Sequence, residues 1–213
     1  MTYLEIVNKV LLKLRENTVT SVSETPYSQL IGELVNDVKT EMEEAWNWEG
    51  LRTIKTVLTV NGTSNYTITG TNSGTRLLDI WNNTEDFFLK ERPRDWFVSK
   101  LRGANPTTGE PFYYAINGRS SSGELNMDVY PIPDQEYSIQ VNCVVPQAEL
   151  SLDSTEVLLS GDIIAEGVVA RAISERGDDG GFMEQEQRFR SRLSDAISIE
   201  AGRHSTEIIW GAC

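Results

Sequence analysis

The chain has 213 residues and a formal net charge of −13; 39% of its residues are hydrophobic and 24% are charged. This composition is typical of a folded protein, and the acidic balance argues against one that grips nucleic-acid phosphates, because that affinity comes from Lys and Arg. No apolar run approaches the roughly 18 residues that a membrane-spanning helix needs, and no signal peptide is recognisable. The two cysteines, Cys143 and Cys213, form neither a metal-binding motif nor a disulfide framework. We therefore expect a protein without membrane contact that folds in a reducing cytoplasm.

Residues 2–15 are predicted to form a first amphipathic helix. Thr2 and Glu5 have the spacing of a capping box, in which each side chain satisfies a backbone N–H group at the helix start. Lys13 near the far end complements the helix dipole. The stretch 17–25, which is rich in Ser and Thr, then predicts a linker.

A second, longer helix is expected over residues 25–50. Thr25 offers a hydroxyl group at the N-cap position and Pro26 suits the first helical position, so the start is well marked. The apolar residues recur with the three-and-four spacing of one helical face, and the opposite face is expected to be solvated and strongly acidic. The apolar positions are Ile31, Leu34, Val35, Val38, Met42, Ala45 and Trp46, and the solvated ones are Glu33, Asp37, Lys39, Glu41, Glu43 and Glu44. After Trp46-Asn47-Trp48 the periodicity becomes strand-like.

Residues 51–146 predict a β section of short antiparallel strands joined by Gly, Asn and Pro turns. β-Branched residues alternate over Thr53–Val60, and Asn61-Gly62 is a hairpin signal, so Tyr66–Thr69 is expected to pair with this strand. Asn117-Gly118 predicts a later turn. Further strands are expected at 77–81, 86–90, 112–116, 124–130 and 137–145, with a short helix at 95–101. The pattern favours a small sandwich or an open barrel.

Two more helices are predicted after the β section. Ser160 and Gly161 start the first and Gly177 ends it, and the last helix runs over about 182–202 with Glu184–Arg188 and Glu186–Arg190 as favourable pairs. The simplest way to bury one apolar face on each helix is a bundle. The expected fold class is therefore α+β, a four-helix bundle interrupted by an inserted antiparallel β module. The bundle comprises residues 1–50 and 158–203, the β module residues 51–146, and a C-terminal tail residues 204–213.

No combination of residues predicts an enzyme, a cofactor or a metal site. Glu200 and His204 lie four residues apart, but a third metal ligand is absent. Asp162 and Glu166, also four apart, are better explained as carboxylates that stabilise a helix start than as an acid–base pair. Asp178-Asp179-Gly180 resembles only a fragment of a calcium loop. Nucleophile elbows, phosphate-binding Gly loops and dinucleotide fingerprints are not found in the sequence.

Several segments together resemble a known protein family. They are the first helix ending in Leu11-Leu12-Lys13-Leu14-Arg15, the second closing on Glu44-Ala45-Trp46-Asn47-Trp48 before the strand Thr53–Val60, the run Val129-Tyr130-Pro131-Ile132-Pro133, and an Arg/Glu-rich last helix. This arrangement is similar to the head-to-tail adaptor (tail tubular protein A-like) family of short-tailed bacteriophages. The resemblance extends over most of the chain.

The resemblance implies a structural virion protein that is not an enzyme. Such adaptors form a homo-oligomeric ring, typically a dodecamer, between the portal protein and the tail nozzle protein, and DNA passes through its lumen during genome ejection without specific binding. The helices and the C-terminal segment would contact the portal, and the β module would face the nozzle and tail fibres. The expected location is the neck and tail of the virion, after assembly in the host cytoplasm.

The C-terminal tail carries the candidate interface residues Ile208, Ile209 and Trp210. A tail this short has no core of its own, so these side chains need a partner, either in their own domain or in another chain. The acidic composition also fits a DNA channel, because an acidic lumen repels the DNA backbone and avoids a salt-dependent grip.

Two other functions stay open at this point. Trp81, Tyr113 and Tyr114 are aromatic residues of a type that is often exposed and binds sugars. A carbohydrate-binding or hydrolysing β module on a helical support is therefore one alternative. Another phage neck protein, such as a tail-completion factor with the same partners, is the second.

Overall fold

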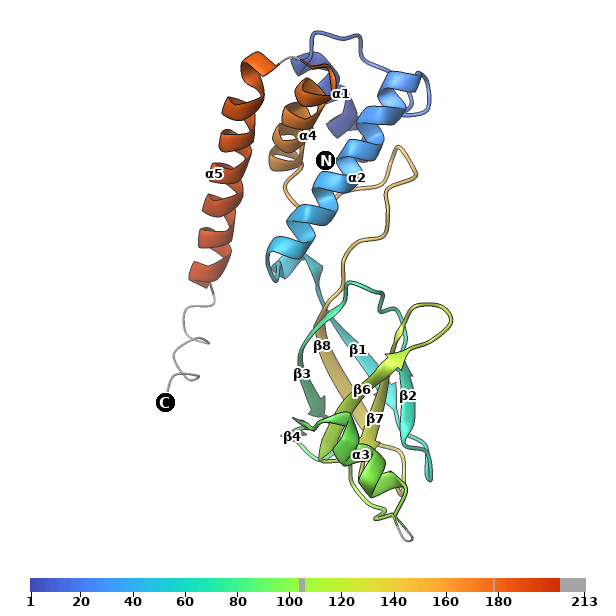
Figure 1. Cartoon of the computed structure of the whole chain (residues 1–213). Coiled ribbons are helices and arrows are strands. Elements are labelled where there is room, and N and C mark those ends of the chain that lie inside the picture. Colours follow the sequence, from blue (N-terminus) through green and yellow to red (C-terminus); the bar gives the residue numbers. More distant parts are fainter. Residues whose placement is uncertain (104–105, 178, 204–213) are drawn as a thin grey trace. The chain divides into compact units, whose positions relative to one another are not determined.

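The chain folds into two compact units, one helical and one built mainly of strands (Figure 1). The helical unit combines Met1–Gly50 with Gln147–Cys213, and the β unit is Leu51–Pro146. The computed structural model describes residues 1–103, 106–177 and 179–203. The predicted α+β class is confirmed.

Two capping boxes begin the first helices of the helical unit. At α1 (Tyr3–Lys13), the Thr2 hydroxyl accepts from the backbone N–H of Glu5, and the Glu5 carboxylate accepts from the backbone N–H of Thr2. At α2 (Pro26–Ala45), Thr25 has the same relationship with Ser28, and Pro26 is the first helical residue. Both predicted starts are therefore correct, because capping depends on side chains within one helical turn.

The helix α4 (Gly161–Glu175) packs against α1, α2 and α5 (Asp179–Arg203) (Figure 1). Gly167 makes this packing close, since a Cβ atom there would lie 2.8 Å from Val38 of α2 and 2.9 Å from Phe189 of α5. Because α5 packs along α4, the regular four-helix bundle expected from the sequence stays a prediction. The buried core of the unit is Tyr3, Ile6, Val7, Val10, Leu11, Val19, Val22, Ile31, Val35, Val38, Met42, Leu150, Val157, Ile163, Ile164, Ala165, Val168, Val169, Ala172 and Phe189.

The solvated face predicted for α2 is wrong at two positions. Lys39 and Glu43 are each 2% exposed and form an ion pair inside the helical unit, where the backbone of Gln147 joins them. Their spacing along the helix places Lys39 and Glu43 beside its apolar face. Whether they are buried depends on the segment around Gln147, which packs over them. The other acidic positions of this face, Glu33 and Asp37 among them, are exposed as predicted.

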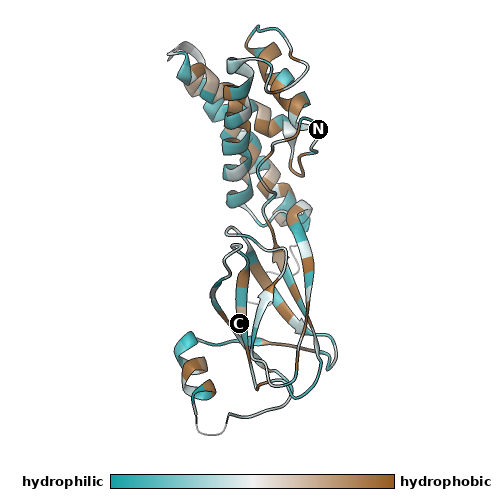
Figure 2. Ribbon diagram, turned by 90° about the vertical axis from the view of Figure 1, so that its right-hand side faces the viewer, coloured by the Kyte–Doolittle hydropathy of each residue, from teal (hydrophilic) through white to brown (hydrophobic). Residues whose placement is uncertain are grey.

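The β unit contains two four-stranded sheets with a shared core. Hydrophobic and hydrophilic residues alternate along several strands, as Figure 2 shows. One sheet has the order β1 (Arg52–Leu58), β8 (Ser138–Val144), β3 (Arg76–Asn82) and β4 (Phe87–Phe88). The other has the order β2 (Asn65–Ile68), β7 (Leu125–Tyr130), β6 (Tyr113–Arg119) and β5 (Lys90–Glu91). The pairings are antiparallel except that of β5 with β6, and the buried residues of both sheets form one core, as in a sandwich.

The hairpin predicted at Asn61-Gly62 is wrong. β1 pairs with β8 over seven residues, from Arg52 opposite Val144 to Leu58 opposite Ser138, whereas the four residues of β2 pair with β7 in the other sheet. A turn does form, because the Thr63 N–H donates to the Val60 carbonyl and Gly62 between them has φ +79°. The turn signal is local, but the strand partner is chosen by the longer ladder and by burial in the common core.

Asn117-Gly118 does not form a turn between strands. These residues lie inside β6, where the register with β7 shifts between Ile116 and Arg119 and Gly118 has φ +85°, so they form an irregularity of the strand. The short helix α3 (Arg94–Leu101) follows Pro93 as predicted and buries Phe97 against β6 and β7. A 3-10 turn, η1 (Glu49–Leu51), precedes β1.

Candidate interaction surfaces

The candidate interface residues Ile208, Ile209 and Trp210 lie outside the described residues, and their role stays a prediction. His204 and Cys213 lie there too, so the Glu200–His204 spacing has no described geometry. Asp178, with the side chains of the two residues after it, is likewise not described. Within the described ranges, no group of three or more His, Cys, Asp or Glu side chains is placed to hold a metal ion.

Asp162 and Glu166 of α4 are ion-paired instead of facing each other as an acid and a base. Lys9 of α1 donates to Asp162, and this hydrogen bond holds the pKa of the Asp162 carboxyl below its usual range. Arg192 of α5 donates to Glu166, and Lys13 lies 3.9 Å from the same carboxylate. Both acids therefore connect α4 to its neighbours, and the acid–base alternative receives no support.

Four cations gather around these two acids, and we call them the basic patch: Lys9, Lys13, Arg188 and Arg192. Burial lowers the pKa of the Lys13 ammonium, and the positive charges of Lys9, Arg192 and Arg188 lower it further against the opposing effect of Glu166. Lys9, Lys13 and Arg192 contact these two acids directly, and Arg188 lies one helical turn before Arg192 on α5. The patch carries more positive than negative charge in a chain whose total is −13.

The outer face of α2 carries only negative charge. Glu33, Asp37 and Glu41 follow one another at four-residue intervals, so they form one row, which we call the acidic row. Lys39, the one basic residue of α2, is buried. Glu41 pairs with Arg171 of α4. In the helical unit, α2 and α5 each pack against α4 (Figure 1), so the acidic row and the Arg residues of α5 lie on different helices.

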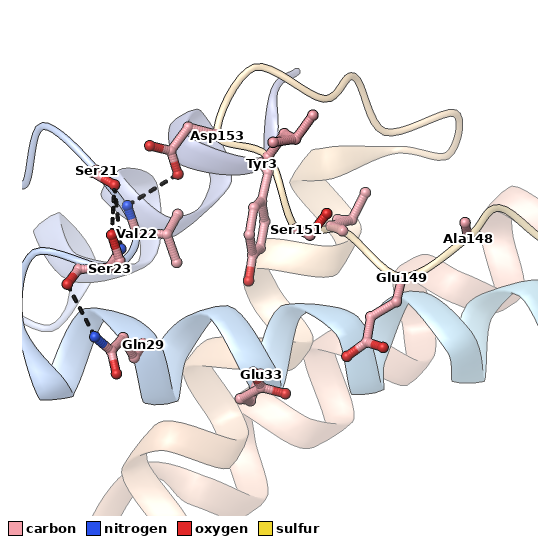
Figure 3. A pocket seen from close by; sticks show the side chains of 12 residues that line it. Tyr3, Ser21, Val22, Ser23, Gln29, Glu33, Ala148, Glu149, Ser151 and Asp153 are labelled. Atoms are coloured by element: carbon pink, nitrogen blue, oxygen red, sulfur yellow. Dashed lines mark hydrogen bonds between the residues drawn. The ribbon is translucent and has the colours of Figure 1, made fainter.

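An open cleft of about 780 Å³ lies between the start of α1, the linker before α2, and the segment 148–153 (Figure 3). Tyr3 points into it, and Glu33 and Glu149 stand beside its hydroxyl group (Figure 3). Burial, with the charges of Glu33, Asp153 and Glu149, raises the pKa of Tyr3 to about 12. A phenol with this pKa stays neutral at physiological pH, and the lining residues include no Lys, Arg, His or Cys. The lining of the cleft therefore offers no cation that would hold a phosphate.

Residues 1–208 match the SU10 adaptor protein family, which is nearly the whole chain. The protein belongs to the SU10 adaptor protein family. This is a family of phage head-to-tail adaptors, so the resemblance found in the sequence is confirmed. The family is structural, in agreement with the absence of a recognisable catalytic motif in the sequence. No curated protein matches this chain. Among its described residues, no helix is both long enough and apolar enough to cross a membrane.

The β unit has an aromatic hollow on the outer face of the β1-β8-β3-β4 sheet. The rings of Trp81 and Phe88 meet edge to face with centroids 4.5 Å apart, and Ile54 is 61% exposed beside them. The hollow has a volume of about 290 Å³ and is lined by Ile54, Asp79, Trp81, Phe88, Gln140 and Asn142. Tyr113 and Tyr114 lie in the other sheet, so the structure does not bring them together with Trp81.

The basic patch was not predicted from the sequence. A usable signal was present, because Lys9 with Lys13 and Arg188 with Arg192 are each four residues apart and each pair shares one helical face. The two pairs of cations are 175 residues apart in the chain, from Lys13 to Arg188. Only the packing of both helices on α4 brings the four cations together.

Proposed function

We propose that this adaptor forms a homo-oligomeric ring between the portal protein and the tail nozzle protein of a short-tailed phage, and that DNA passes through the lumen of the ring. The family match over residues 1–208 carries the proposal. The dodecamer of the resembling family is the stoichiometry that we propose, and the neck of the virion is the proposed location.

The charge distribution supports an assembly of this kind. A ring of identical subunits needs two different surfaces on each subunit, one for each neighbour. The helical unit offers two such surfaces, since the acidic row and the basic patch differ in charge and lie on different helices. The excess of acidic residues elsewhere in the chain also supports a lumen that DNA passes without a salt-dependent grip.

The two units would meet different partners within this proposal. We assign the helices of residues 1–50 and 158–203, with the tail 204–213, to the portal, and the β module 51–146 to the nozzle and the tail fibres. Cross-linking with mass spectrometry on assembled necks tests the assignment. Cross-links from the β module to the portal, with none to the nozzle, would contradict it.

Reconstitution with the cognate portal ring tests the proposal as a whole. Purified adaptor is added to purified portal, the mass of the complex is measured by mass photometry, and the complex is imaged by cryo-electron microscopy. The expected result is a closed ring of adaptor on one end of the portal. An adaptor that never associates with the portal would contradict the proposed function.

A carbohydrate-binding role is the second candidate, and the aromatic hollow is the observation that favours it. Trp81 presents an aromatic side chain beside the polar groups of Asp79, Gln140 and Asn142, which is a combination that binds sugar rings. Two of these groups are already engaged with each other, since Asn142 donates to Asp79 at 2.9 Å. Binding of the wild-type protein to a glycan array that is lost in Trp81→Ala would support this role. If the wild-type protein binds no glycan on a broad array, the role is ruled out.

A further inference from the structure

Two surfaces of the helical unit differ in their dominant charge. The basic patch gathers on α1 and α5, and the acidic row follows the outer face of α2. The central part of α5, residues 187–194, contains three Arg and no acidic residue, and every exposed charged residue of α2 is acidic. α2 and α5 each pack against α4 (Figure 1), so the acidic row and the basic patch lie on different helices of the unit.

Two copies of this chain repel each other as a whole, because each carries a formal charge of −13. Long-range repulsion of this kind opposes association unless the contacting faces carry unlike charge. The basic patch is the place on the helical unit where four cations converge, and the acidic row supplies carboxylates on a different face of the same unit. A second copy of this chain is therefore an occupant whose chemistry fits the patch.

We propose that the basic patch of one adaptor copy binds the acidic row of the α2 helix of the next copy. The two faces belong to different helices, so the contact is heterologous and each copy uses one face toward each neighbour, as a closed ring requires. The inference rests on the proposed ring and names the surfaces that build it. Salt weakens the contact, because both faces are solvent-exposed in the free chain.

Arg188 is the cation of the patch best placed to reach a neighbour. It is exposed and has no ion-pair partner among the described residues, whereas Lys9 and Arg192 are held by Asp162 and Glu166. On the acidic row the corresponding groups are Glu33 and Asp37, which are exposed, since Glu41 already pairs with Arg171 of its own chain. Charge reversal at these three residues leaves the ion pairs within the chain intact.

The test measures how many adaptor copies occupy a cognate portal ring, by mass photometry over a range of adaptor concentrations. Arg188→Glu alone should raise the adaptor concentration that fills the ring by roughly tenfold or more. The paired change Glu33→Arg/Asp37→Arg alone should have the same effect. The variant that combines all three changes restores the attraction with its sign exchanged, so it is expected to fill the ring at close to the wild-type concentration.

Arg190→Glu is the matched control on the same helix, because Arg190 is exposed and pairs with Glu186 instead of joining the patch. It should fill the ring like the wild type. Circular dichroism of each variant verifies that it is folded. Suppose that the wild type fills the ring. The inference is then wrong, while the proposed function stands, if reversing the charge of one face alone leaves the filling concentration unchanged. It is also wrong if the combined variant does not restore filling. If Arg188→Glu prevents even a single adaptor copy from binding the portal, and the combined variant does not restore this binding, the patch contacts the portal and not a neighbouring copy, which would overturn the inference. A wild type that never binds the portal overturns both.

Discussion

Lys39 and Glu43 form an ion pair in the interior of the helical unit, with 3.1 Å between the Lys39 Nζ and a carboxylate oxygen of Glu43. The Lys39 ammonium also donates to the carbonyl of Gln147 at 2.8 Å, and the N–H of Gln147 donates to Glu43 at 3.1 Å. The two charges therefore satisfy both backbone groups of one residue. This arrangement fixes the start of the segment that leads to α4 onto α2, which apolar side chains at the same positions would not do.

Replacing Lys39 with Ala is expected to destabilise the helical unit strongly. The substitution removes one partner of a buried ion pair, and breaking such a pair costs about 3–5 kcal/mol. Urea unfolding followed by far-ultraviolet circular dichroism, which reports chiefly on the helices, measures the loss. The exposed neighbour Asp37 supplies the control, since Asp37→Ala should change the free energy of unfolding by no more than about 0.5 kcal/mol. Equal effects of the two substitutions would show that the pair contributes nothing special.

Gly167→Ala is expected to destabilise the same unit by about 1–3 kcal/mol, although Ala favours helix formation. The added Cβ atom would meet Val38 at 2.8 Å and Phe189 at 2.9 Å, so α2 or α5 has to move away from α4. Gly181→Ala is the matched control, because nothing lies within 4 Å of its Cβ position in α5. The thermal unfolding midpoint should fall for the first variant and hold or rise for the second. A midpoint that rises for both would contradict the close packing at Gly167.

The ion pair between Lys9 and Asp162 predicts a dependence of stability on acid pH. Because Lys9 lowers the folded-state pKa of Asp162, the pair stabilises the fold above the ordinary pKa of an Asp carboxyl, and this contribution is lost as the pH falls through the folded-state pKa. The thermal stability of the wild type should therefore exceed that of Asp162→Asn by a constant margin near neutral pH, and the margin should shrink below about pH 4. Glu175→Gln, an exposed change at the end of the same helix, should show no such convergence. A margin that persists into strong acid would contradict the assignment.

The parts of the fold that were predicted correctly depend on neighbouring residues. Thr2 and Thr25 cap their helices through groups three residues away, so the local sequence determines where each helix starts. The pairing of β1 with β8 joins residues such as Thr53 and Cys143, which are 90 positions apart, and the local signal at Asn61-Gly62 says nothing about them. The α+β class could be predicted because it needs only the kinds of element, whereas the strand order needs their partners.

The candidate interaction surfaces show the same difference between features set by nearby residues and features set by distant ones. The acidic face of α2 could be recognised from spacing along one helix, and most of it is exposed as predicted. The burial of Lys39 could not, because the residue that covers it, Gln147, is 108 positions away. The basic patch was missed for the same reason, since Lys13 and Arg188 converge only through the packing on α4.

Deleting residues 208–213 is expected to weaken docking of the adaptor onto the portal. Ile208, Ile209 and Trp210 form an apolar segment in a tail that follows the last described residue, and the resemblance to head-to-tail adaptors assigns such a segment to the portal. Burying one large apolar side chain contributes about 1.5–3 kcal/mol, so Trp210→Ala alone should weaken binding by roughly tenfold or more. Binding is measured by biolayer interferometry with immobilised portal. Cys213→Ser, a small change in the same segment, should bind like the wild type. Undiminished docking of the truncated chain would place the portal contact elsewhere, and the helices that carry the basic patch would be the next region to test.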